Sequence, residues 1–188
     1  MKKSQMTKPT FYRMCQDNSL AGRWLVDNPD ITESDDDTWF DLKRGKYLAG
    51  RSPVKIEISK RGRAMDVSMT SLGNLVLSSR TAQLLEGLAP GEAQFLDADI
   101  DSAHIGYKVV NLLNHPDCLD PGLSDMLDPY PDGRLNILRV AIDSKAAGQR
   151  NIFRVATWPV AIVIAQRVRD RLEEQGATGA TYSKLRSS

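Results

Sequence analysis

The sequence contains few of the residues on which disulfide frameworks, metal centres and membrane spans depend. Its 188 residues include 2 Cys and 2 His, and neither cysteine stands in a paired motif. Two isolated cysteines in a chain without an export signal are typical of reduced thiols. The longest apolar run, residues 160–165, is far shorter than the about 20 residues of a membrane-spanning helix. These shortages argue against a disulfide-rich secreted domain and a helical membrane protein.

The chain also lacks a charge excess that would select a class of partner. A net charge of +1 gives no overall attraction to nucleic acid or membranes. Residues 1–10 carry positive charge without an apolar stretch behind it, which predicts a flexible arm rather than a signal peptide. We therefore expect a cytoplasmic protein with one domain over residues 11–188, made of two lobes of about 11–103 and 104–188.

A strand–helix–strand pattern occurs twice. The first copy begins with the apolar residues 75–77 and closes near Phe95, and the second begins with residues 162–164 and closes near Tyr182. A duplicated unit and two similar units of separate origin both fit this pattern. It predicts an α+β fold with mainly antiparallel sheets, a few packed helices and two similar strand–helix–strand units.

The two helices of this pattern are expected at residues 79–88 and 165–175. Leu84, Leu85 and Leu88 form an apolar face on the first helix, as Val168 and Leu172 do on the second. A hydroxyl of Ser78 or Ser79 could cap the first helix by accepting from its free N–H groups.

Two further segments are assigned from their turn residues. Residues 54–58 and 65–69 alternate apolar with polar side chains on either side of Lys60-Arg61-Gly62-Arg63, which predicts a β-hairpin. Residues 114–133 carry four Pro and two Gly and are expected to form a long structured loop, with at most one helical turn.

The candidate metal sites do not have the required ligand residues at the required spacing. Asp97, Asp99 and Asp101 have the spacing of the first three ligands of a calcium-binding loop. However, Ser102 and Lys108 stand at the positions where that loop needs a Gly and a bidentate Glu. We expect no bound metal, no cofactor and no catalysis.

The Asp-rich loop at residues 117–128 leaves an enzymatic alternative open. His115 and Cys118 could bind zinc with Asp117 and Asp120, although a packed turn explains the same residues and paired Cys or His spacings are absent. The flanking glycines of a nucleophile elbow are also missing around Ser78.

Charge is segregated near the N-terminus. Residues 27–41 contain seven carboxylates, no Lys or Arg, and two adjacent aromatic residues, which predicts a partner-binding segment. The predicted contact residues are Asp27, Asp30, Glu33, Asp35, Asp36, Asp37, Trp39, Phe40 and Asp41. Residues 43–63 follow with eight Lys or Arg against Glu57. The acidic segment could instead be a solvated loop that screens the charge of this basic stretch. A separate alternative is that the protein is regulatory and binds nucleic acid through the basic stretch.

Residues 107–120 resemble a signature of the immunity proteins of bacterial polymorphic toxin systems, specifically immunity family eleven. There, an aromatic strand ending in Asn leads into an Asp-Cys-Leu-Asp type turn and then a Ser, here Ser124. The strand-to-Ser start at residues 75–78, the Ile-Phe-Arg strand at 152–154 and the Gly-Ala-Thr-Gly turn at 176–179 follow in the family's order.

The resemblance covers roughly residues 40–183 and implies a non-enzymatic cytoplasmic protein that binds and neutralises a cognate protein toxin. It implies no nucleic-acid or membrane partner. The family's closing Phe is replaced by Tyr182, displaced within Ala180-Thr181-Tyr182. The shared motifs consist of turn-forming and strand residues, so they are expected to support the scaffold rather than contact the toxin.

Overall fold

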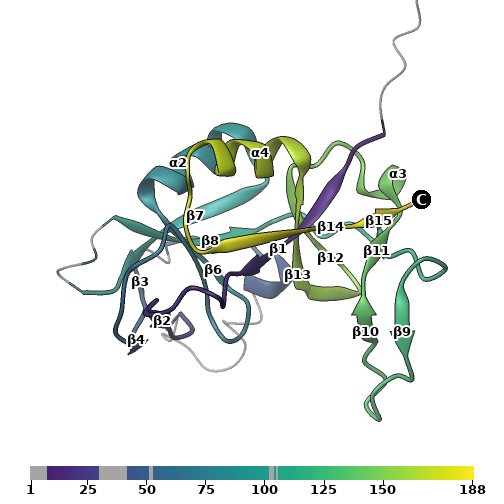
Figure 1. Ribbon diagram of the computed structural model, residues 1–188, viewed down its shortest axis with the longest axis horizontal. Coiled ribbons are helices and arrows are strands. Elements are labelled where there is room, and N and C mark those ends of the chain that lie inside the picture. Colours follow the sequence, from purple (N-terminus) through teal and green to yellow (C-terminus); the bar gives the residue numbers. More distant parts are fainter. Residues whose placement is uncertain (1–7, 30–41, 51–52, 102–103, 105) are drawn as a thin grey trace, which may run out of the picture.

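The computed structural model describes residues 8–29, 42–50, 53–101, 104 and 106–188. Two β-sheets form the centre of the protein (Figure 1). The first sheet has the order β3 (Val54–Lys55), β7 (Ala93–Asp99), β8 (Tyr107–Leu112), β6 (Leu75–Ser78) and β5 (Val67–Met69). The second has the order β12 (Ile152–Val155), β13 (Trp158–Ala165), β1 (Phe11–Gln16) and β14 (Ala180–Lys184). Three two-stranded ladders accompany them: β2 (Leu25–Val26) with β4 (Ile58–Lys60), β9 (Asp125–Leu127) with β10 (Asn136–Arg139), and β11 (Ala141–Ile142) with β15 (Arg186–Ser187).

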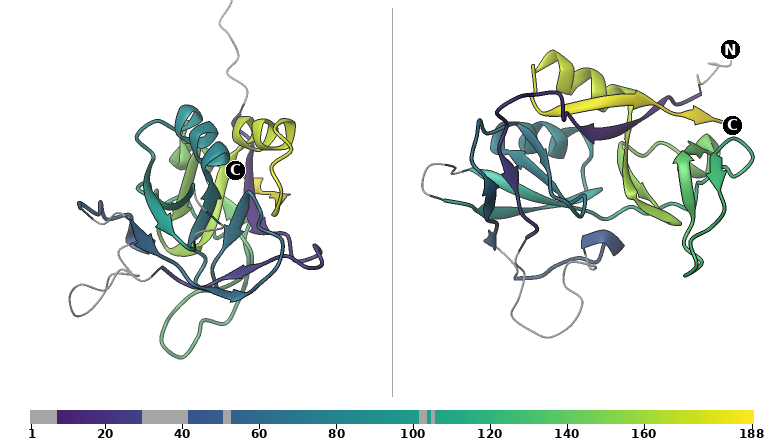
Figure 2. Two further views of the ribbon diagram at one scale, coloured as in Figure 1. Left: turned by 90° about the vertical axis from the view of Figure 1, so that its left-hand side faces the viewer. Right: turned by 60° about the horizontal axis from the view of Figure 1, so that its bottom comes forward.

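Each central sheet contains one strand–helix–strand unit whose two strands enclose a third strand. β6 and β7 lie on either side of β8 and run antiparallel to it, while β13 and β14 enclose β1 in the same way. The connecting helices are α2 (Ser79–Leu88) and α4 (Gln166–Glu174), which contact each other on the same side of the sheets (Figure 2). The prediction of an α+β fold with two similar units is confirmed. β8 follows β7 directly along the chain, whereas β1 comes from the N-terminal part, so each sheet contains one strand from across residue 103. The boundary between two lobes near residue 103 stays a prediction.

Alternation along the strands divides the core into layers. Leu75 and Leu77 of β6 face the helices, where they pack with Leu85 of α2 and Leu172 of α4. Val76 between them faces the opposite side and joins a second cluster around Trp24. A third cluster, around Phe11 and Phe153, lies behind the second sheet. The helices were therefore placed correctly from their apolar faces. None of the helices in the described ranges has the length and apolarity to cross a membrane.

The predicted hairpin in residues 54–69 is wrong. Its strands separate into different ladders: β3 pairs with β7, β4 with β2, and β5 with β6. The expected turn instead runs against residues 22–24, since the Arg63 N–H donates to the Gly22 carbonyl at 2.8 Å and the Trp24 N–H donates to the Arg63 carbonyl at 3.1 Å. Period-two patterning indicated strands here but could not show which neighbours they pair with.

Two local predictions also need correction. Ser78 occupies the N-cap position of α2, but its hydroxyl makes no cap hydrogen bond. It donates to the Asp66 carboxylate at 2.9 Å. The segment 114–133 is not only a loop, because it contains β9, the first strand of a hairpin with β10. A short helix, α3 (Ser144–Ala147), begins after Asp143, whose carboxylate accepts from the Lys145 and Ala146 N–H groups.

Candidate protein-binding surface

The β9–β10 hairpin extends away from the two central sheets (Figure 1). Its tip is a turn in which the Gly133 N–H donates to the Tyr130 carbonyl at 2.8 Å and the Tyr130 N–H donates to the Arg134 carbonyl at 2.9 Å. Pro131 occupies the second position of this turn, where its fixed φ angle is favourable. The Arg134 guanidinium lies over the Tyr130 ring, 5.4 Å from its centroid. These contacts give the tip a defined shape.

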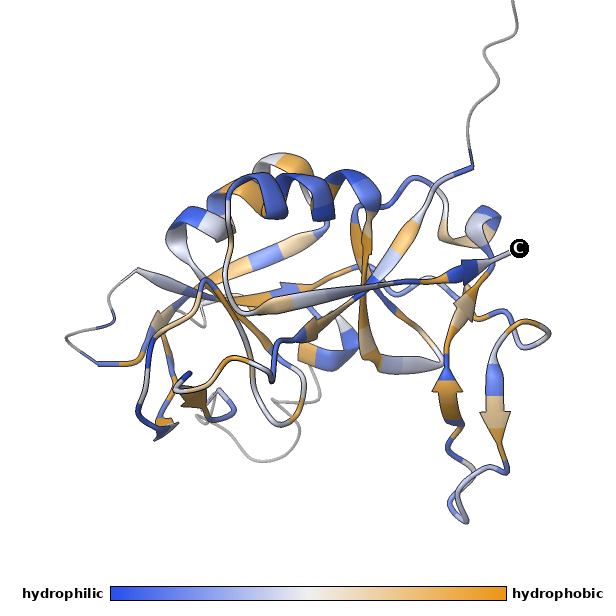
Figure 3. Ribbon diagram, in the orientation of Figure 1, coloured by the Kyte–Doolittle hydropathy of each residue, from blue (hydrophilic) through white to orange (hydrophobic). Residues whose placement is uncertain are grey.

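Apolar residues occupy much of this hairpin, as the hydropathy colouring of the ribbon shows (Figure 3), and several of their side chains are exposed. Of the eight large apolar residues that are exposed in the described part of the chain, five lie between residues 123 and 138: Leu123, Met126, Leu127, Tyr130 and Leu138. Grouped exposed apolar side chains mark interaction sites in soluble proteins more often than scattered ones do.

A β-bulge in β10 explains the most exposed of the aliphatic residues. Ile137 pairs with Met126 and Arg139 with Asp125, so Leu138 is the extra residue between them. The bulge lets Ile137 and Val140 both enter the buried cluster behind the second sheet. It leaves the Leu138 side chain 59% exposed.

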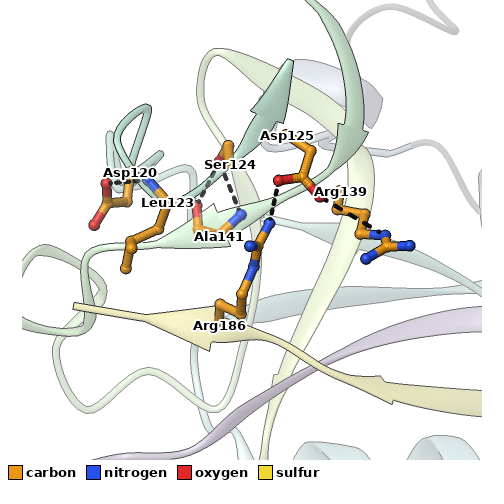
Figure 4. Close-up of polar contacts among 7 residues, drawn as sticks. All are labelled: Asp120, Leu123, Ser124, Asp125, Arg139, Ala141 and Arg186. Carbon is orange, nitrogen blue, oxygen red and sulfur yellow. Dashed lines mark hydrogen bonds and ion pairs between the residues drawn. The ribbon is translucent and has the colours of Figure 1, made fainter.

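The base of the hairpin is fixed to the body by polar contacts (Figure 4). The Ser124 hydroxyl accepts from the Ala141 N–H at 2.9 Å and lies 3.3 Å from the Ala141 carbonyl. Arg186 donates to the Asp125 carboxylate at 2.7 Å, and the Arg139 guanidinium lies 3.8 Å from the same carboxylate. The hydrogen bond from Arg186 lowers the pKa of Asp125, which therefore stays ionised. The exposed apolar side chains thus lie on a hairpin whose base is held in place by these contacts.

The acidic segment predicted to bind a partner falls almost wholly outside the described residues. Asp27 alone is described: it is exposed, and its N–H donates to the Glu57 carbonyl at 2.8 Å. The other eight predicted contacts lie outside the described residues: Asp30, Glu33, Asp35, Asp36, Asp37, Trp39, Phe40 and Asp41. Their role stays a prediction.

The Asp-rich loop at 117–128 makes structural contacts. The Asp120 carboxylate accepts from the Leu123 N–H at 3.1 Å, and a hydrogen bond with Ser188 lowers its pKa. Cys118 is 1% exposed, and burial raises the pKa of its thiol to about 11. Burial also lowers the pKa of His115, and among the described residues no three His, Cys, Asp or Glu side chains form a metal-binding group.

The motifs that carried the family resemblance support the scaffold. Asn111 is fully buried and donates to the Lys46 carbonyl at 2.7 Å. Its neighbour Gln94 bonds both the N–H and the carbonyl of Leu48, so together they hold the segment after residue 42 against the first sheet.

Arg154, in the Ile-Phe-Arg strand, joins the two sheets from inside the protein. It is 1% exposed and donates to the carbonyls of Pro159 at 2.6 Å and Gly73 at 2.7 Å. Its Nε has no hydrogen-bond partner among the described residues, and burial lowers the pKa of Arg154 to about 10.

The Gly-Ala-Thr-Gly turn joins the two units directly. The Thr178 N–H and hydroxyl donate to the Asp66 carboxylate at 3.0 and 2.8 Å, and the Val67 N–H donates to the Thr178 carbonyl at 2.9 Å. Gly179 lies so close to β5 that a Cβ would overlap the Val67 carbonyl oxygen. These shared motifs thus have structural roles, and a partner surface is better sought outside them.

Sequence reasoning missed the exposed hairpin. The signal was present, because Leu123, Met126, Leu127 and Tyr130 interrupt a segment otherwise rich in Pro, Gly and Asp. Apolar residues between turn residues indicate either burial under a loop or an exposed contact surface, and the sequence does not distinguish the two.

Comparison with known proteins gives one finding. The model of the immunity protein family Imm11 matches residues 16–187. A search of curated proteins found none that matches the chain.

Proposed function

Because the chain belongs to the Imm11 immunity protein family, we propose that it neutralises a cognate protein toxin by direct, stoichiometric binding in the cytoplasm. Neutralisation of this kind needs a surface complementary to the toxin rather than a catalytic centre. The described residues offer such a surface on the β9–β10 hairpin, and the family membership supports a protein partner.

The observation that carries this assignment is the grouping of five exposed apolar side chains on the anchored hairpin and in the turn that leads into it. Tyr130 has the properties of an interface anchor: it is 48% exposed, its ring is held by Arg134, and tyrosine is enriched among residues that dominate binding energies. The anchored base lowers the entropy that binding would otherwise cost.

The acidic segment at residues 27–41 is a second proposed contact region. Seven carboxylates without a neutralising Lys or Arg repel one another unless solvent or a partner offsets the repulsion. Asn replacements of Asp35, Asp36 and Asp37 should slow association with the toxin and flatten its salt dependence, whereas Trp39→Ala should raise the dissociation rate.

The test uses the toxin encoded beside the gene. Wild-type protein should protect cells that express this toxin and should form a complex of fixed stoichiometry with it. Tyr130→Ala should raise the dissociation constant about tenfold or more, which corresponds to about 1.4 kcal/mol. Tyr47→Ala is the matched control, because Tyr47 is 66% exposed but lies outside the hairpin.

Three results would contradict parts of this proposal. Wild-type protein that neither protects nor binds would refute the immunity role. Normal binding by Tyr130→Ala would remove the hairpin tip from the interface, and unchanged rates in the triple Asn variant would remove the acidic segment.

A further inference from the structure

A groove of about 450 Å³ lies between β10 and β14, at the base of the hairpin. Downstream of it, β11 and β15 pair in parallel. Upstream of that pair the chains diverge, because β10 pairs with β9 and β14 pairs with β1 (Figure 1). In the described part of the chain, β10 and β14 are therefore both edge strands that face this groove.

The groove has a strong excess of positive charge. Arg13, Arg139, Lys184 and Arg186 contribute to its lining, and none of its described lining residues is Asp or Glu. The nearby Asp125 carboxylate is shared between Arg186 and Arg139.

Arg13 has no carboxylate partner among the described residues, and its guanidinium lies 5.0 Å from the centroid of the Trp158 ring. Its charge is thus available to an added anion.

The groove also has an apolar part. The β-bulge exposes Leu138 at its edge, and Cys15 of β1 lies beside Arg13 in the lining. A surface that combines cations, an exposed leucine and two strand edges differs from a simple anion site, which needs charge and N–H groups alone.

We propose that this groove receives an extended acidic segment of the toxin, an inference that rests on the proposed immunity function. The arginines would pair with carboxylates of that segment, and Leu138 would contact an apolar side chain between them. An extended segment can add to an exposed sheet edge through its main chain, as in β-strand addition. Nucleic acid fits less well, because no aromatic ring for base stacking is among the lining residues.

The first test reverses one charge in the groove. Arg139→Glu should raise the dissociation constant for the toxin at least tenfold. Arg61→Glu should change it less than twofold. The two positions are matched, because Arg139 and Arg61 are 80% and 84% exposed and each lies 3.8 Å from one carboxylate. Equal binding by both variants, while the wild-type protein binds the toxin, would overturn the groove assignment but leave the immunity function standing.

The second test needs no substitution. Cys15 is half-buried in the groove, whereas Cys118 is buried with its pKa raised to about 11, so a maleimide should label Cys15 selectively. Saturating toxin should slow this labelling at least tenfold. Unchanged labelling in the complex would overturn the proposal. Protection of Cys15 by a single-stranded oligonucleotide but not by the toxin would overturn it in favour of nucleic acid.

Discussion

Leucines in the two-unit body and leucines on the β9–β10 hairpin have opposite surroundings. In the body, Leu75 and Leu172 are 0% and 2% exposed, whereas Leu127 and Leu138 on the hairpin are 51% and 59% exposed. In the body, apolar residues pack the two units against each other, whereas on the hairpin several apolar residues are exposed to solvent. Stability and binding should therefore depend on different residues, and substitutions in the two regions test this separation.

The largest expected effect is at the turn that joins the two units. Gly179 has a φ of +98°, and a Cβ there would overlap the Val67 carbonyl oxygen and lie 2.7 Å from the Met65 Cβ. Gly179→Ala should lower the free energy of unfolding by about 4 kcal/mol or more, as measured by urea denaturation.

Gly176 provides the control within the same turn. Its φ is also positive, at +69°, but no atom lies within 4 Å of the position of a Cβ. Gly176→Ala should cost only about 1–2 kcal/mol, the strain of the left-handed conformation. Equal losses for the two variants would show that backbone strain alone, and not the approach of β5, requires glycine at residue 179.

The next effect compares leucines directly. Leu172→Ala removes a side chain buried between α4 and the sheets, and it should lower the free energy of unfolding by about 2–5 kcal/mol. Leu127→Ala removes an exposed side chain and should change it by less than about 0.5 kcal/mol. If Leu127→Ala also lowered the free energy of unfolding by several kcal/mol, the hairpin would contribute to the core. Stability and binding would then not depend on different regions.

A smaller effect is expected from the carboxylate that links the units. Burial alone would raise the pKa of Asp66, but hydrogen bonds from Thr178 and Ser78 outweigh it and lower the pKa. Asp66→Asn should therefore cost about 1–2 kcal/mol near neutral pH. Asp128→Asn, at an exposed hairpin position, should cost less than about 0.5 kcal/mol.

The pH dependence of this effect has a definite sign. Since the folded pKa of Asp66 is below the ordinary value of 3.8, its stabilisation is present above that value and is lost as the pH falls through the folded pKa. The difference between wild type and Asp66→Asn should shrink as urea denaturation is measured from pH 6 down to pH 3 and below. A constant difference would mean that the ionised carboxylate is not what stabilises the turn.

The sequence predicted the body better than the hairpin, for physical reasons. Helices α2 and α4 and the strands that precede them have strong local patterns, with Leu85, Val168 and Leu172 at helical spacing. Many strand partners depend on contacts between distant residues, so the pairing of β4 with β2 and of β3 with β7 had no local signal.

The candidate surface depended on similar long-range information. The apolar residues of β9 could equally have packed under a loop, and only the pairing with β10 shows them exposed. The groove beneath the hairpin joins Arg13 of β1 to Arg139 and Arg186, which no sequence spacing connects. The charges of the acidic segment, by contrast, lie close together in the sequence, so the sequence alone indicates this segment.

The smallest stability effect is expected from removing the residue that best marks the hairpin as a surface. Deleting Leu138 would leave Ile137 and Arg139 opposite Met126 and Asp125, which are consecutive, so the ladder would become regular. Ile137 and Val140 would keep facing the core, because alternation then places them on the same side. We expect the free energy of unfolding to stay within about 1 kcal/mol of wild type in urea denaturation, while affinity for the toxin falls. This result would indicate that the main role of the bulge is to expose Leu138 beside the groove between β10 and β14. If the deletion lowered the free energy of unfolding by more than about 3 kcal/mol, the bulge would be required for folding. The hairpin would then contribute to stability as the body does.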